Sequence, residues 1–177
     1  MTLPEDARQQ VVGYLKHQAS KSTSDLLVLV DRAAGWIEQP LAGMSESQAR
    51  FHPSPDEWSV ADVLRHVDAS MCGTARIIEA LAAGKGAEVN THGPSLAGLV
   101  DDTGQTLAEL RSGVARAYDE VRAAVAAIPE GTASGATAFH PFFGDLNCKE
   151  WAAFVYVHSR DHADQIQNVK GTSAFPR

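Results

Sequence analysis

The chain of 177 residues contains no apolar run long enough to cross a bilayer. Its first residues, Met1–Asp6, are polar and do not combine a cationic segment with an apolar core, so we do not expect a signal peptide. Lys and Arg number 15 against 22 Asp and Glu, which gives a net charge of −7 without any basic run. We therefore expect a cytoplasmic protein that binds neither nucleic acid nor membranes.

Cysteine is scarce, and the common nucleotide and protease motifs are missing. Cys72 and Cys148 form no CxxC pair, and two cysteines do not make a disulfide scaffold, so a reducing compartment is favoured. The sequence has no Gly-rich phosphate loop, dinucleotide fingerprint, HExxH motif or Ser-His-Asp grouping. These absences argue against a nucleotide-dependent enzyme, a serine hydrolase or a zinc protease of the HExxH type.

What the sequence does contain is helical periodicity in a single domain, residues 1–177, with 44% apolar residues. Apolar positions recur three or four residues apart in four segments, and no strand pattern competes with them. We predict an all-α, four-helix, mostly up-down bundle. Its helical segments are expected at residues 5–37 with a break near 20–24, 59–83, 95–128 and 147–169.

Two helix starts carry clear capping signals. Ser59 followed by Asp62 predicts a capping box, and Asn147 followed by Glu150 predicts another. Gly84 suits the end of the helix that begins at Ser59. The Gly/Pro/Thr-rich connection at 129–147 is long for a compact domain, which suggests that it has a role.

Three histidines lie on the predicted buried stripes. His66 lies in the 59–83 helix, while His158 and His162 are spaced i, i+4 and leave the same face of the last helix. Burying these rings costs free energy unless their nitrogens find partners, and a shared divalent metal would satisfy them together. Three protein ligands would leave one position for water or substrate. The alternative is that they are core histidines satisfied by neighbours.

Further residues near the proposed ligands have less certain roles. The side chains that could orient a ligating imidazole are Asp62, Asp68, Asp161, Asp164 and Gln165. Cys72 is turned about 120° from His66 around its helix, which makes it a poor fourth ligand. His140 could lie over the site and move protons, or it could be a structural loop residue packed by Phe142 and Phe143. Zinc or nickel suits imidazole ligands best, with iron and manganese left open.

Two stretches resemble the signatures of DinB-like proteins. They are EWSVADVLRH at 57–66 and HPFFGDLNCKEWAAFVYVHSRDHADQI at 140–166, and the resemblance extends over about residues 24–169. The resemblance implies the DinB/YfiT-like bundle, a divalent metal held by His66, His158 and His162, and a homodimer. Characterised relatives include thiol-dependent enzymes such as mycothiol-dependent maleylpyruvate isomerase and bacillithiol S-transferases.

Several functions are compatible with these residues. The leading hypothesis is a metal-dependent transferase that acts on a small-molecule substrate with a low-molecular-weight thiol as co-substrate. A metal-dependent hydrolase, with water in place of the thiol, is a close variant. Two alternatives come from other functional classes. One is a non-catalytic bundle stabilised by its metal, and the other is an interaction module whose histidines are core residues.

Overall fold

The computed structural model describes residues 4–86, 104–132 and 135–177. Four long helices form a bundle: α2 (Thr23–Glu38), α4 (Val60–Ala82), α5 (Leu107–Ala126) and α6 (Cys148–Gly171). The shorter elements are α1 (Glu5–Ala19), a 3-10 turn η1 (Gln39–Leu41), α3 (Glu46–Ala49), β1 (Thr137–His140) and β2 (Gly144–Asn147). The all-α four-helix prediction is confirmed.

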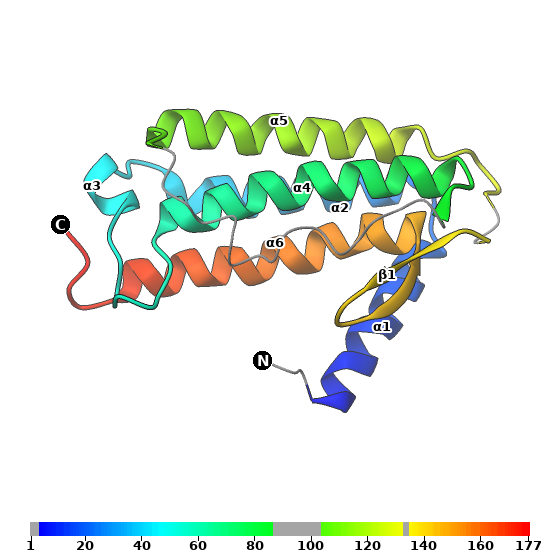
Figure 1. The fold of residues 1–177 in the computed structure, drawn as a ribbon, viewed down its shortest axis with the longest axis horizontal. Helices are drawn as coiled ribbons and strands as arrows, with labels where there is room; N and C mark the ends of the chain where they lie inside the picture. The colour runs from blue at the N-terminus through cyan, green and yellow to red at the C-terminus, as the bar shows by residue number, and fades with distance from the viewer. Residues whose placement is uncertain (1–3, 87–103, 133–134) are drawn as a thin grey trace.

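The bundle has its helices in the cyclic order α2, α6, α4, α5, since each packs against the next and α5 packs back on α2. Their apolar stripes meet in one core, which contains fully buried Leu26, Leu64, Ile78 and Ile166 among others. Helix α1 lies outside this ring, packs on α6 and diverges from the bundle axis (Figure 1). The four helices thus enclose a core of ordinary aliphatic side chains.

One connection departs from strict up-down alternation, because α4 and α5 run in the same direction (Figure 1). The first amide of α5, that of Leu107, donates to Glu46 of α3, the short helix that precedes α4. At the opposite end, Gly86 after α4 lies against Thr137 of β1, which precedes α6. The connection at residues 83–106 therefore joins opposite ends of the bundle, a long crossover of a kind that some four-helix bundles contain.

Each long helix begins with a capping box, in which the cap side chain and the side chain three residues on satisfy each other's backbone amides. The predicted boxes at Ser59/Asp62 and Asn147/Glu150 are confirmed. The other two begin α2 and α5, at Ser22 and Thr106.

These caps settle two boundaries that periodicity left uncertain. The break expected near 20–24 is confirmed, because Ser22 starts a new helix there. The predicted start of the third helix near Ser95 falls outside the described residues. The described part of that segment is not helical before Leu107, because Gly104 has a φ of +73° and Thr106 is the cap.

The region 129–147 was predicted without strands, and that expectation is wrong. Residues 137–140 and 144–147 pair as an antiparallel hairpin, with His140 opposite Gly144. Gly144 closes the turn with a φ of +76°, a conformation that favours glycine. The strands are too short for period-two alternation to be recognised in the sequence.

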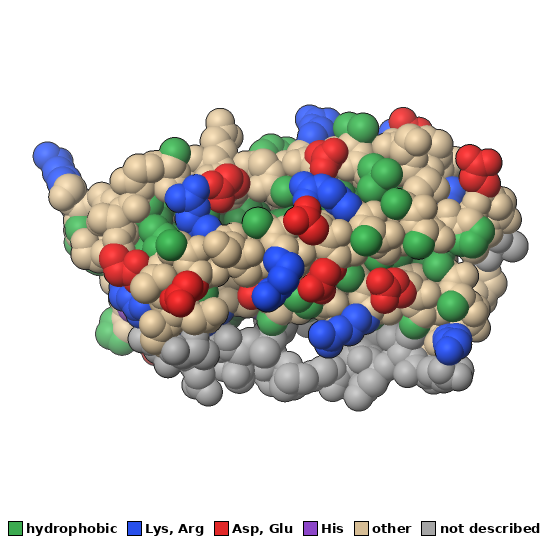
Figure 2. Space-filling model, turned by 90° about the horizontal axis from the view of Figure 1, so that it is seen from above, with side chains coloured by type: hydrophobic (Ala, Val, Ile, Leu, Met, Phe, Trp, Pro, Cys, Tyr) green, Lys and Arg blue, Asp and Glu red, His purple; other side chains and the backbone are tan. Residues whose placement is uncertain are grey.

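The described surface shown in Figure 2 has no charged patch of one sign, and both cysteines are unpaired. On the face in Figure 2, acidic and basic side chains are interspersed among apolar ones. Among the described residues no helix combines the length and apolar character that a bilayer span requires. Cys72 and Cys148 are both free thiols.

Candidate metal centre

His66, His158 and His162 meet in the space between α4 and α6. One nitrogen from each ring lies within 4.8 Å of the corresponding nitrogens of the other two. The Nε2 atoms of His66 and His158 are 3.1 Å apart. Among the described residues these three form the one group of His, Cys, Asp and Glu side chains with such geometry. The structure therefore brings the three predicted ligands together.

The local sequence explains why the rings converge. The Ser59/Asp62 capping box fixes the start of α4, and His66 follows two turns later on the buried face. On α6 the i, i+4 spacing stacks His158 and His162 on one side, with ring centroids 4.4 Å apart. Because α4 and α6 pack together, His66 reaches across to this pair.

Burial keeps all three imidazoles neutral at pH 7. It lowers the pKa of His66 to about 4, and the nearby His162 adds to this effect. Burial also lowers the pKa of His158 well below its usual range and lowers that of His162. Neutral imidazole is the form that coordinates a metal, so the electrostatics of the cluster suit ligation.

Hydrogen bonds to the outer nitrogens are unevenly distributed. Gln165 accepts from the Nδ1 of His162 at 2.9 Å, which leaves the Nε2 lone pair directed at the cluster. The Nδ1 atoms of His66 and His158 are buried without a hydrogen-bond partner. Three buried rings that share one outside acceptor are costly on their own. A cation would bind the inner nitrogens of all three rings, which otherwise only face one another, so the donor set of the residues present fits a divalent metal.

Two neighbours of the cluster were not recognised from the sequence. The Ser70 hydroxyl lies 3.3 Å from Nε2 of His66, one helical turn further along α4. The Trp58 ring, just before the start of α4, lies parallel to the ring of His162 with centroids 6.4 Å apart, and its centroid is 5.2 Å from that of the tilted His66 ring. The i, i+4 relation to His66 could have identified Ser70, but nothing local indicated the position of Trp58.

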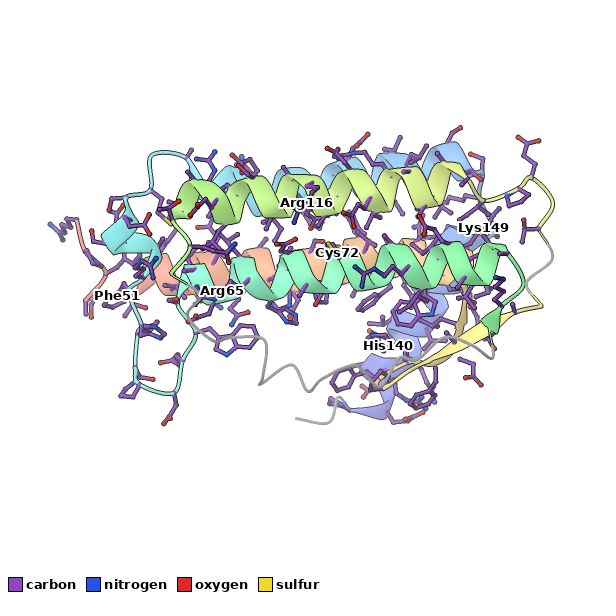
Figure 3. All side chains as sticks on the ribbon, turned by 45° about the horizontal axis from the view of Figure 1, so that its top comes forward. Phe51, Arg65, Cys72, Arg116, His140 and Lys149 are labelled. Carbon is purple, nitrogen blue, oxygen red and sulfur yellow. The ribbon has the colours of Figure 1, made fainter. Side chains whose placement is uncertain are left out.

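His140 lies near the cluster but does not join it. Its ring is 4.5 Å from that of Phe154, which in turn is 5.4 Å from His158. The backbone amide of Phe142 donates to Nδ1 of His140 at 3.2 Å, so the ring proton is on Nε2. Burial lowers the pKa of His140 to about 4. In Figure 3 it lies on the hairpin, away from Arg65 at the start of α4.

The aromatic surroundings of His140 include the residues expected to pack it. Its ring stacks on Phe143 at 4.8 Å and lies 5.9 Å from Phe142. Phe142 remains 45% exposed, so the group of aromatic rings around His140 faces solvent on that side. The packing role of these two residues in the hairpin is therefore clear, and a role of His140 in proton transfer stays a proposal.

Cys72 points away from the histidines. Its thiol donates to Asp68 at 3.7 Å, in the region where α4 faces Arg116 of α5 (Figure 3). Burial, together with the nearby carboxylates Glu120 and Asp68, raises the pKa of Cys72 to about 11. A protonated thiol directed elsewhere is not a ligand, in agreement with the angular argument from the sequence.

A cavity of about 490 Å³ lies beside the cluster. Trp58 contributes to its wall and also lies against His66 and His162, so this side chain separates the cavity from the cluster. Charged side chains line much of the rest, among them Arg50, Arg65 and Asp62. Arg65 and Asp62 form a buried ion pair within this wall. The cavity has a mixed lining and is large enough for a small ligand.

Comparison with known proteins agrees with this architecture. The solved structure of TT2238, described as a four-helix bundle protein, superimposes with a TM-score of 0.64 at 19% identity, covering 83% of this chain and 99% of that one. At this identity the likeness concerns the fold alone. No curated protein matches the chain. A sequence model of the DinB superfamily matches residues 30–166, and the chain therefore belongs to the DinB superfamily.

Proposed function

We propose that His66, His158 and His162 hold one divalent metal ion. The observation that carries this proposal is the convergence of three neutral ring nitrogens within 4.8 Å, from two helices that are fixed by capping boxes. Membership of the DinB superfamily supports it. Zinc and nickel suit an all-imidazole donor set best, and iron and manganese are the other candidates.

We further propose that this centre is catalytic, in a transferase that joins a small thiol to an electrophilic substrate. A bound divalent metal would lower the pKa of a coordinated thiol or water, so that the nucleophile exists near neutral pH. Three protein ligands leave a position for such a group. A small molecule is thus the expected partner.

The chain's own side chains have distinct roles in this proposal. The Ser70 hydroxyl, next to the inner nitrogen of His66, can donate a hydrogen bond to a group bound at the cluster. Trp58 shields two of the rings from water. His140 stays the candidate for proton transfer; with its proton on Nε2 and its ring neutral, it would donate a hydrogen bond to the leaving atom of a substrate bound at the cluster.

A hydrolase is the closest alternative, because the same site could activate water. The two are separated by following the loss of an electrophilic substrate, such as an activated aryl halide, with and without a thiol. Loss that requires the thiol supports the transferase. Loss at the same rate without any thiol contradicts it and favours the hydrolase.

A non-catalytic metal site is the alternative from another class. The cluster joins α4 to α6, so a bound ion would also act as a cross-link that stabilises the bundle. Metal that raises the melting temperature, with no reaction detected for thiol or water, would favour this function.

Metal content is the measurement that tests the proposal first. We expect about one equivalent of zinc or nickel per parent chain by elemental analysis. The double variant His158→Ala/His162→Ala should contain none. The double variant His17→Ala/His52→Ala, outside the cluster, serves as a matched control and should keep its metal. Parent protein that stays empty after incubation with both metals would leave an interaction module as the remaining function.

Two further expectations belong to this proposal. The chain should be a homodimer, as the DinB resemblance implies, and light scattering after size-exclusion chromatography measures this directly. A cytoplasmic location follows from the sequence-based expectation of a reducing compartment, and fractionation of the source cells tests it.

A further inference from the structure

A second cluster of side chains lies where α1, α2 and α6 meet. Tyr156 of α6 lies between Trp36 of α2 and Tyr14 of α1: its ring is 4.5 Å from that of Trp36, at a tilt, and 6.1 Å from that of Tyr14, stacked. All three side chains are half-buried. We call this group, together with the arginines described next, the Arg–Tyr cluster.

Two arginines cover these rings. The guanidinium carbon of Arg32 lies 5.7 Å from the ring centre of Tyr156, and that of Arg160 lies 5.9 Å from the ring centre of Trp36. Both arginines are exposed. A guanidinium that lies over a ring contacts it with its face and keeps the N–H donors at its edge available.

Within the described part of the chain, neither arginine forms an ion pair. This is unusual for the molecule, because six of its other arginines pair with a carboxylate: Arg8, Arg50, Arg65, Arg111, Arg116 and Arg122. Asp31 and Asp161 are their neighbours in sequence, but neither carboxylate pairs with these two guanidinium groups, so their N–H donors stay available to a ligand.

Both arginines act electrostatically on Tyr14. Burial and the neighbouring Tyr156 raise the pKa of Tyr14, and the positive charges of Arg32 and Arg160 both oppose that rise. The ring contacts agree with this, since Arg32 lies over Tyr156 and Tyr156 contacts Tyr14. The two guanidinium groups and the three rings thus share one patch of surface.

This patch is separate from the histidines. Tyr156 and Arg160 are spaced i, i+4 and share one side of α6. His158 falls midway between them in sequence and about 200° away around the helix, so it leaves the opposite side. The Arg–Tyr cluster consequently cannot be part of the same pocket as the metal ligands.

We propose that the Arg–Tyr cluster binds the phosphate group of a small ligand. Guanidinium edges and phenol hydroxyls are hydrogen-bond donors, and a phosphate dianion offers enough acceptor oxygens for several of them. Stacking on the rings holds both arginines in place before binding, so little side-chain freedom is lost when the ligand arrives. A carboxylate, with two oxygens and one charge, would use fewer of these donors.

Calorimetric titration of the intact protein tests the proposal, with inorganic phosphate, phenyl phosphate and benzoate as probes. Both phosphates should bind the parent chain, and benzoate should bind at least about tenfold more weakly. Arg32→Gln and Arg160→Gln should each weaken phosphate binding at least about tenfold. Arg76→Gln, an exposed arginine of α4 without a described ion pair, is the matched control and should bind as the parent does.

The outcomes separate the sources of the phosphate group and the competing explanations. Tighter binding of phenyl phosphate than of inorganic phosphate would indicate a phosphate ester, and the reverse would indicate free phosphate. Equal loss in Arg76→Gln would overturn the proposal in favour of a general charge effect. Binding that survives both cluster variants but disappears in His162→Ala would place the anion at the histidines and also overturn it.

A variant that preserves the packing controls for misfolding of the arginine variants. Tyr14→Phe keeps the stacked ring and removes only the hydroxyl, so the melting temperature should not change. We expect it to weaken phosphate binding severalfold. Unchanged binding in Tyr14→Phe, together with a loss of folding in both arginine variants, would mean that the cluster only holds α1 against α2 and α6.

Discussion

At the scale of single residues, the histidine cluster depends on which nitrogen of each ring carries the proton. Only His162 has an outside acceptor, Gln165, that fixes its proton on Nδ1. The Nδ1 atoms of His66 and His158 have no hydrogen-bond partner, while their Nε2 atoms face each other, with the Ser70 hydroxyl beside that of His66. The side chain of Gln165 should therefore matter more than its half-exposed position on α6 suggests.

We expect Gln165→Leu to weaken metal binding by about 10- to 100-fold, because the His162 ring loses the hydrogen bond that orients it. Competition against a chelator of known affinity measures this. The control is Gln167→Leu on the exposed side of the same helix, which should bind as the parent does. Equal affinities of the two variants would show that the Gln165 contact has no influence on the metal.

At the scale of helices, the start of α4 is the element most closely tied to the site. The Ser59 and Asp62 side chains satisfy each other's amides within a buried cap, and Asp62 also pairs with Arg65. The cap that begins α2, at Ser22, is exposed. The two caps have the same chemistry in different surroundings.

Ser59→Ala should lower the free energy of unfolding by about 2 kcal/mol, because it leaves buried cap amides and Asp62 without their partner. Ser22→Ala should cost about 1 kcal/mol or less, since water replaces its hydroxyl. Urea denaturation of both variants gives the comparison. A cost for Ser59→Ala no larger than that for Ser22→Ala would argue against the importance of burial at this cap.

At the scale of the whole molecule, a metal that joins α4 to α6 should stabilise the fold. We expect zinc at 100 times its dissociation constant to add about 2.7 kcal/mol to the free energy of unfolding and to raise the melting temperature by several degrees. The same zinc should leave the melting temperature of His66→Ala unchanged. Thermal scanning with and without metal measures both, and an equal rise in the variant would locate the metal elsewhere.

The pH dependence of stability is also a property of the whole molecule. Burial lowers the pKa of His140 to about 4, while in the unfolded chain it is near 6.5. Between these values the unfolded chain binds more protons, so stability present above pH 6.5 is lost as the pH falls towards 4. The contribution of His140 is at most about 3 kcal/mol.

Urea denaturation of metal-free protein at several pH values between 4 and 7 measures this loss. His140→Phe keeps an aromatic ring between Phe143 and Phe154 but cannot be protonated. It should therefore lose less stability than the parent over that range. The parent also contains the buried His66, His158 and His162, which both proteins share. An identical pH profile for the two proteins would mean that His140 does not contribute to the loss.

The sequence alone determined the elements that depend on local chemistry. Helical periodicity and the Ser59 and Asn147 caps set the ends of α4 and the start of α6, and the i, i+4 spacing placed His158 and His162 on one face. It did not determine the hairpin, whose strands are too short for a pattern, nor the start of α5, where Gly104 and Thr106 override the apolar repeat.

Tertiary structure alone decided which side chains meet across helices. His66 comes from α4 and its partners from α6, so their convergence depends on how the two helices pack. The same holds for Trp58 beside the cluster and for Tyr14, Trp36 and Tyr156, which no spacing along the chain relates. Periodicity records which face of a helix is buried, whereas contact between faces depends on the packing of the whole bundle.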